Sequence, residues 1–256
     1  MLQAHSFLWH YLWVAPNILL LGLGILLWRR GVGRQFPAFC VFATLSAICH
    51  LALYVADIAP WVSSPAFWRV DWGSLLTETL LKFVVIAAVF SNVFQPYPSV
   101  SRLGKLLVRG LGGILVLTAA IAAGFARPDN IYGLISGAHL LEQTVLLIVS
   151  GIILSLFLMA AYFHLRLDRA SFGILLGLGI SSCVHLATWA VMANATVSVH
   201  GRTLFDFLNM ATYHVCVLIW FYYLLTPDKV VGKPTAPLPG SNLAVWNREL
   251  ERLIHQ

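Results

Sequence analysis

The chain has 256 residues, of which 59% are hydrophobic and 10% are charged, whereas soluble domains carry about 25% charged residues. So few polar side chains cannot cover a water-exposed globule of this size, which excludes a soluble enzyme, a disordered protein and a nucleic-acid-binding protein. The net charge of +6 therefore indicates an uneven distribution of basic residues between the loops of a membrane protein, whose main partner is the lipid bilayer.

Seven apolar segments are long enough to cross a bilayer. About 20 apolar residues cover the roughly 30 Å hydrocarbon core at about 1.5 Å per residue. In chain order the segments are 11–28, 36–58, 72–94, 106–126, 132–162, 172–194 and 203–225. The predicted fold is all-α, a polytopic bundle of seven transmembrane helices within residues 1–226.

Basic residues predict the orientation of this bundle. The segments that follow the first, third, fifth and seventh spans carry Arg29, Arg30, Arg34, Arg102, Lys105, Arg109, Arg166, Arg169, Lys229, Lys233, Arg248 and Arg252. The opposite side carries only Arg69, Arg127 and Arg202. Because basic loops stay in the cytoplasm, the N-terminus is expected outside and the C-terminus in the cytoplasm.

The composition changes after the last span. Several prolines and a glycine between residues 227 and 242 predict an irregular linker. Apolar residues then recur at helical spacing from Leu243 to Ile254, with charged residues on the other face. Residues 243–256 are therefore predicted to form a cytoplasmic amphipathic helix, which lies on the membrane surface or binds a cytoplasmic protein partner.

Ionisable residues within the spans fall at one depth. Counted from the outer end of each span at about 1.5 Å per residue, they lie roughly 10 to 16 Å into the membrane. They are His50, Glu78, Lys82, His139, Glu142, His185 and His214. Such residues are costly in hydrocarbon and usually face a bundle interior or a water-filled cavity. Glu78 and Lys82 are four residues apart on one helix face and are expected to form an ion pair.

Histidines and glutamates in one layer favour a cofactor site. We expect His50, His139, His185 and His214 to bind a cofactor, and His139, His185, His214 and Glu142 to be the candidate metal ligands. Three protein ligands suffice for catalytic zinc, and the same residue types suit another transition metal. Two facing histidines also serve as axial ligands of haem b. A site without any cofactor remains an alternative.

Three functions are compatible with this layer. The first is binding or sensing of a metal ion, a haem or a small polar ligand that arrives from the periplasm. The second is a metal-dependent intramembrane hydrolase, in which Glu78 or Glu142 acts as the general base on a zinc-bound water. The third is a structural polar network between helices.

Two short segments resemble known sequences. Gln35-Phe36-Pro37-Ala38-Phe39 and Trp246-Asn247-Arg248-Glu249-Leu250 are similar to features of uncharacterised bacterial seven-span membrane proteins. The resemblance implies the seven-span topology and a multi-pass protein of the bacterial inner membrane, and it implies no activity. A microbial rhodopsin is excluded, because no lysine for a retinal Schiff base occurs between residues 203 and 225.

Overall fold

The computed structural model describes residues 5–95, 131–162, 167–194 and 199–226, together with the single positions 102, 106, 110, 113, 117, 245, 251 and 252. At residues 32, 131–142, 193–194 and 199–200 it describes the backbone alone. The predicted fourth span at 106–126, the linker at 227–242 and the terminal helix at 243–256 lie outside this description, apart from the single positions just named, which are all helical.

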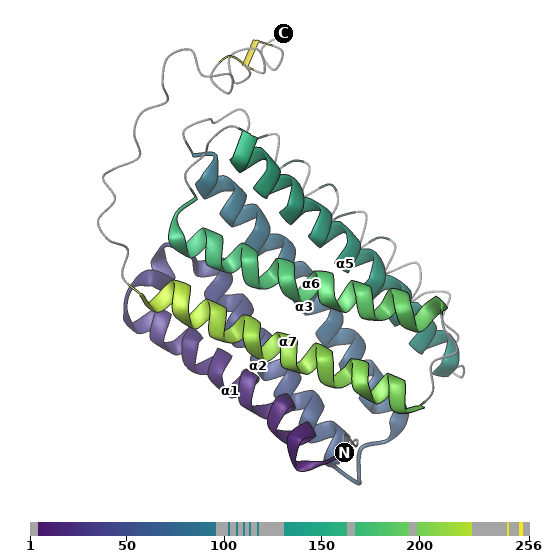
Figure 1. Ribbon diagram of the computed structural model, residues 1–256. Coiled ribbons are helices and arrows are strands. Elements are labelled where there is room, and N and C mark those ends of the chain that lie inside the picture. Colours follow the sequence, from purple (N-terminus) through teal and green to yellow (C-terminus); the bar gives the residue numbers. More distant parts are fainter. Residues whose placement is uncertain are drawn as a thin grey trace.

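Six long helices make up the described part of the chain (Figure 1). They are α1 (Phe7–Arg29), α2 (Pro37–Ile58), α3 (Ser64–Val93), α5 (Ile131–Tyr162), α6 (Arg169–Asn194) and α7 (Val199–Leu225), with a short 3-10 helix, η1 (Val32–Arg34), between α1 and α2. Each contains one of the predicted spans, apart from the single end residues Phe36 and Phe94. The all-α prediction is confirmed for these residues.

All six helices are long and apolar enough to cross a membrane. In each, between 22% and 39% of the most apolar window is buried inside the protein. The remaining surface is rich in exposed aliphatic side chains, such as Ile18, Val84, Leu154 and Val215. A helix that is apolar on its outer as well as its inner face requires lipid around it, so the chain is a multi-pass membrane protein.

Local sequence explains where the helices begin and end. Ser6 caps α1, because its hydroxyl accepts a hydrogen bond from the Trp9 amide at 3.3 Å. Gly31, with φ of +77°, ends the same helix in a left-handed conformation that glycine adopts without strain. Helix α3 begins eight residues before the predicted span at 72–94, at Ser64, with a proline in its first turn. Hydropathy marks only the part of a helix that lies in hydrocarbon.

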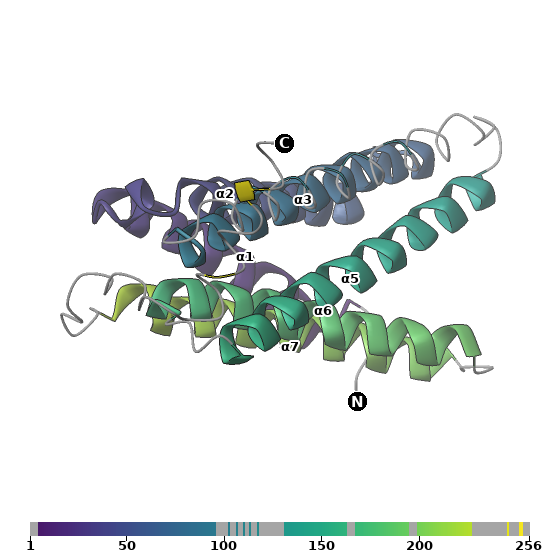
Figure 2. The same ribbon diagram turned by 90° about the horizontal axis from the view of Figure 1, so that it is seen from above.

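The six helices form a closed ring. Going round the ring, α1 packs on α2, α2 on α3, α3 on α5, α5 on α6, α6 on α7, and α7 on α1. Seen from above, α2 and α3 lie in one layer and α6 and α7 in another (Figure 2). The space between the layers is where side chains from all six helices meet.

Contacts between neighbours fix the direction of each helix. Trp9 meets Phe207, and Arg30 donates to the Leu225 carbonyl at 3.4 Å, so α1 and α7 run parallel. Phe157 meets Phe172, and Thr188 bonds Asn209, so α6 runs against both α5 and α7. A short connection makes α2 and α3 antiparallel, as are α1 and α2. Hence α1, α3, α5 and α7 all point one way.

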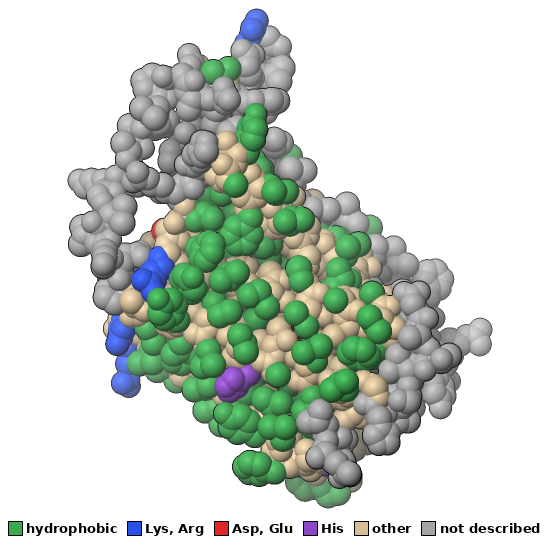
Figure 3. Space-filling model, viewed as in Figure 1, with side chains coloured by type: hydrophobic (Ala, Val, Ile, Leu, Met, Phe, Trp, Pro, Cys, Tyr) green, Lys and Arg blue, Asp and Glu red, His purple; other side chains and the backbone are tan. Residues whose placement is uncertain are grey.

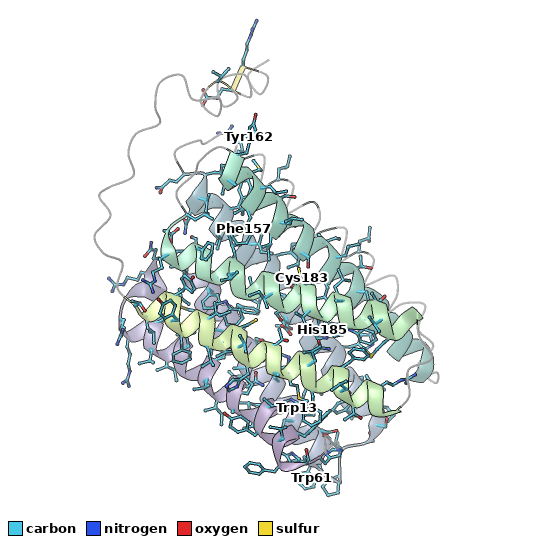
Figure 4. The ribbon with its side chains drawn as sticks, viewed as in Figure 1. Trp13, Trp61, Phe157, Tyr162, Cys183 and His185 are labelled. Atoms are coloured by element: carbon cyan, nitrogen blue, oxygen red, sulfur yellow. The ribbon has the colours of Figure 1, made fainter. Side chains whose placement is uncertain are left out.

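The two ends of the bundle differ in charge. The end where α1, α3, α5 and α7 finish carries Arg29, Arg30, Arg34 and Arg169, and is called here the basic end. Blue side chains gather at this edge of the bundle in Figure 3, beside a face covered with hydrophobic groups. The other end, called the Trp61 end after its exposed tryptophan, lies opposite Tyr162 in Figure 4.

The core fills the half of the bundle nearer the basic end. Its fully buried side chains come from every described helix and include Leu23, Phe39, Ile86, Leu156, Leu178 and Trp220. On α6, Gly173 and Gly177 lie against Tyr223 and Trp220, and a Cβ at either glycine would overlap those rings. The Trp220 indole donates to the Ile174 carbonyl at 3.4 Å. Small residues thus let α6 and α7 approach closely.

Candidate functional site

A pocket of about 380 Å³ occupies the half of the bundle nearer the Trp61 end. All six described helices contribute to its lining, and five of them contribute polar side chains. These polar residues are Asn17, His50, Asp71, Ser74, Glu78, Thr79, Lys82, Ser181, His185, Asp206, Asn209 and Tyr213. The pocket therefore concentrates polar groups inside an otherwise apolar bundle.

Glu78 lies at the centre of the charged groups. Its Oε1 is 3.0 Å from Lys82 Nζ, and its Oε2 is 3.5 Å from His50 Nε2. The Glu78 and Lys82 side chains are only 18% and 17% exposed. Opposite charges in contact lower the cost of placing each in a low-dielectric interior.

Helix α3 supplies these charges from one stripe. Asp71, Ser74, Glu78 and Lys82 are spaced by three, four and four residues, and all four line the pocket. Side chains at this spacing point to the same face of a helix. The sequence predicts this stripe because nothing more than helical periodicity is needed to align it.

One wall of the pocket is formed by α1 and α7. Its lining includes Trp13, Asn17 and Tyr213. Asn17 is 2% exposed, and its amide donates to the Trp13 carbonyl at 2.6 Å. The Tyr213 hydroxyl donates to Asn17 Oδ1 at 3.4 Å, and the Tyr213 ring meets the His50 ring edge-on at 5.8 Å. Asn17 is a lining residue that the ionisable residues of the spans do not predict, because its amide carries no charge. Its signal is a single amide within the long apolar run of the first span.

His185 and Asp206 lie on the opposite wall, formed by α6 and α7. The His185 imidazole is within electrostatic range of both the Glu78 and the Asp206 carboxylates. Thr188 Oγ1 lies 2.8 Å from the His185 carbonyl and 3.1 Å from Asn209 Oδ1, which ties the two helices together behind the pocket. Figure 4 shows His185 within the bundle, between its two ends.

His214 does not line the pocket. Its ring meets Tyr11 of α1, with the ring centres 5.8 Å apart, whereas Tyr213 beside it faces His50. Consecutive helical residues point about 100° apart, so only one of the two can face the pocket. The structure thus brings His50, Glu78, Lys82 and His185 together and leaves His214 outside the group.

The predicted metal set is described only in part. The side chains of His139 and Glu142 lie outside the description, so their roles as ligand or general base stay predictions, as do zinc and haem. Within the described ranges, no group of three or more His, Cys, Asp and Glu residues is arranged to hold a metal ion.

Two contacts beside the pocket join α1 and the residues just before it to α2. The Tyr54 hydroxyl and His10 Nδ1 are 3.1 Å apart, and His5 Nδ1 lies 4.0 Å from Asp57 Oδ2. Tyr54 and Asp57 continue the helix face that carries His50. These contacts hold the start of α1 against the end of α2, next to the pocket.

Comparison of the chain with protein-family models, with curated proteins and with solved structures finds no match. The geometry of the pocket therefore carries the functional argument.

Proposed function

We propose that this protein binds a small polar molecule in the central pocket and acts as a membrane sensor for it. One observation carries the proposal. Charged and hydrogen-bonding side chains from five helices surround a space of about 380 Å³ inside an apolar bundle. Ligand pockets measure roughly 300 to 1,000 Å³ and combine apolar walls with a few convergent polar groups.

The cost of these polar groups supports a binding role. Ionisable side chains destabilise a helix in hydrocarbon, and apolar residues would pack a bundle without that cost. Glu78, Lys82 and His50 gain contacts with one another, but they also leave an open space beside them. A purely structural network has no need of that space. A ligand that makes hydrogen bonds within it explains both features.

The proposal includes seven membrane crossings with the N-terminus outside and the C-terminus in the cytoplasm. The parallel course of α3 and α5 supports the seventh crossing, since the chain between Val93 and Ile131 has to return from the basic end to the Trp61 end. The arginines at the basic end support the orientation. The bacterial inner membrane rests on the sequence resemblance, and the pocket would then receive its ligand from the periplasm.

Helix α7 is the proposed route of the signal. It contributes Asp206, Asn209 and Tyr213 to the pocket and ends at Leu225, whose carbonyl accepts from Arg30. A ligand that shifts α7 would move its basic end. We propose that residues 243–256 then alter their contact with a cytoplasmic protein partner.

A binding screen tests the proposal. The purified chain in lipid nanodiscs is mixed with a panel of small polar molecules, and thermal unfolding followed by calorimetry identifies those that bind. Ser181 lines the pocket, so Ser181→Phe fills it and should abolish binding of every compound found. Ser155→Phe makes the same substitution at an exposed position of α5 outside the pocket and should leave binding unchanged.

Binding that persists in Ser181→Phe would place the ligand elsewhere and contradict the proposal. A direct check uses a variant in which the four native cysteines are alanine and Ser181 is cysteine. Water-soluble thiol reagents should modify this cysteine, and a compound from the screen should slow the reaction. A Ser181→Cys thiol that no reagent reaches would mean that the pocket is closed to small molecules.

A further inference from the structure

We infer that the ligand of the central pocket is a small organic cation, such as a primary or quaternary ammonium compound. This inference rests on the proposed function, because it names the chemical class of the molecule bound at the same site. It depends on four features of the described pocket, which are the charge of its lining, the position of that charge, the aromatic rings beside it and the volume.

The lining carries more negative than positive charge. Asp71, Glu78 and Asp206 are its carboxylates, and Lys82 is the one lysine or arginine among the described lining residues. Lys82 is already in contact with Glu78 at 3.0 Å. The described lining therefore holds three carboxylates against one ammonium group, and in a low-dielectric surrounding a carboxylate that Lys82 does not contact attracts a cation.

The carboxylates that Lys82 does not contact lie toward the Trp61 end. Asp71 comes two turns before Glu78 on α3, and Asp206 is near the start of α7, where its side chain is exposed. A solute that approaches from this end meets these two carboxylates before it reaches the Glu78–Lys82 pair. Carboxylates at a mouth raise the local concentration of cations and repel anions.

Aromatic rings line the same space. Trp9 and Trp13 of α1 meet edge-on with ring centres 6.0 Å apart, and Tyr213 of α7 lies beyond them. The faces of such rings attract ammonium groups, most strongly for tryptophan, and aromatic rings with carboxylates are the usual means of recognising quaternary ammonium ligands. The same carboxylates and ring faces repel an anion.

The size of the pocket favours an organic cation over a metal ion. About 380 Å³ is far larger than a single ion requires, since one water molecule takes roughly 30 Å³. The described residues also lack a cluster of three or more metal-ligating side chains. An ammonium compound occupies more of this space than a metal ion does and places its charge near Asp206.

The test compares small probes of different charge, two of which have the same shape. Choline and its uncharged isostere 3,3-dimethylbutan-1-ol have the same shape, and acetate represents a small anion. Calorimetry on the full chain in nanodiscs, repeated with tetramethylammonium and ethylammonium, measures their affinities. We expect at least one ammonium probe to bind in the pocket, choline to bind about tenfold or more tightly than the alcohol, and acetate not to bind.

A matched pair of variants locates the charge. Asp206→Asn keeps the shape of the lining and should weaken ammonium binding about tenfold. Asp57→Asn removes a carboxylate that contacts His5 and does not line the pocket, so it should leave the affinity unchanged. Equal effects of the two variants, or an Asp206→Asn protein with unaltered affinity, would overturn the role of the Asp206 carboxylate in binding the cation.

A second measurement needs no affinity for choline. In the background without native cysteines, Ser181→Cys is treated with a cationic methanethiosulfonate, which carries a trimethylammonium group, or with the anionic sulfonate analogue. At each position the rate of the cationic reagent is divided by the rate of the anionic reagent. This ratio should be about tenfold higher at Ser181→Cys than at Ser63→Cys, an exposed position at the Trp61 end. An equal ratio at the two positions contradicts a cation-selective pocket.

The outcomes separate the two proposals. Tighter binding of the alcohol or of acetate, or no binding by any of the three ammonium probes, overturns the cation and leaves a pocket for another class of molecule. If Ser181→Cys reacts with neither reagent, the pocket is not reached from water, and the proposed binding function fails together with the cation.

Discussion

Glu78 is the residue on which the charged side chains of the pocket converge. Lys82 and His50 approach its two oxygens separately, at 3.0 and 3.5 Å. A carboxylate held on both sides has a fixed position, and this rigidity shapes the pocket around it. Removal of either neighbour leaves the charge partly uncompensated in a mostly buried setting.

We expect Lys82→Met to lower the free energy of unfolding by about 3 to 5 kcal/mol, because it breaks a buried ion pair and leaves the Glu78 carboxylate in place. The double variant Glu78→Gln with Lys82→Met removes both charges and should recover most of the loss. Reversible unfolding in mixed micelles measures both effects. A double variant that is less stable than Lys82→Met would contradict this account of the pair.

The residue scale also shows how far sequence patterns reach. Depth and helical spacing are enough to bring His50, Glu78, Lys82 and His185 into one group, because these rules depend only on the backbone. The face of a single residue is harder to predict. Tyr213 and His214 lie at nearly the same depth, and the rotation of α7, which is set by its packing on α1 and α6, decides that Tyr213 faces the pocket.

At the scale of elements, the contact between α6 and α7 depends on two glycines one turn apart. Gly173→Ala and Gly177→Ala would each insert a Cβ into an aromatic ring of α7. We expect each to lower the free energy of unfolding by about 1 to 3 kcal/mol, since the added Cβ forces the Tyr223 or Trp220 side chain to shift. Thermal unfolding in detergent is the measurement.

Gly151→Ala is the matched control for this pair. Gly151 is also in the middle of a helix, but a Cβ there meets nothing within 4 Å. Alanine should therefore stabilise α5 by about 0.5 to 1 kcal/mol through the loss of backbone freedom in the unfolded chain. If all three variants behave alike, close packing is not the reason for the glycines on α6.

The helices themselves are the part of the fold that the sequence predicts best. Each described helix contains a predicted apolar segment, because the thickness of a bilayer imposes a length on any helix that crosses it. Helix starts were less accurate. The first residues of α3, including Trp68 and Arg69, are too polar for hydropathy to detect but remain helical from Ser64 onward.

At the scale of the whole molecule, the directions of the helices predict the path of the chain. Because α3 and α5 run parallel, cysteines introduced at Gln95 and at Asp129 should be labelled from opposite sides of the membrane. Cysteines at Gly31 and Thr226 should share a side with the one at Gln95, since α1, α3 and α7 end together. Labelling of inverted and right-side-out vesicles with an impermeant thiol reagent tests this.

Labelling of Gln95→Cys and Asp129→Cys from the same side would contradict the seventh crossing. Sequence alone predicts this topology from charge and hydropathy, but it does not predict the ring. Which helices are neighbours depends on side chains that meet across long distances in the chain, such as Asn17 and Tyr213. No local pattern encodes such pairs.

The core between the pocket and the basic end bears on what the protein does with a bound molecule. Leu23, Phe39, Ile86, Leu178 and Trp220 there are each at most 2% exposed. We therefore expect proteoliposomes that contain the protein to show no uptake of any compound that binds the pocket. Flux of the compound into the vesicles would contradict this.

Because of this core, the pocket is closed toward the basic end. Through the described residues, whatever enters from the Trp61 end has to leave by the way it came. A signal can reach the basic end only through a movement of the helices. The bundle is thus suited to transmit a signal that a solute is present across the membrane, while the solute itself stays on the side from which it came.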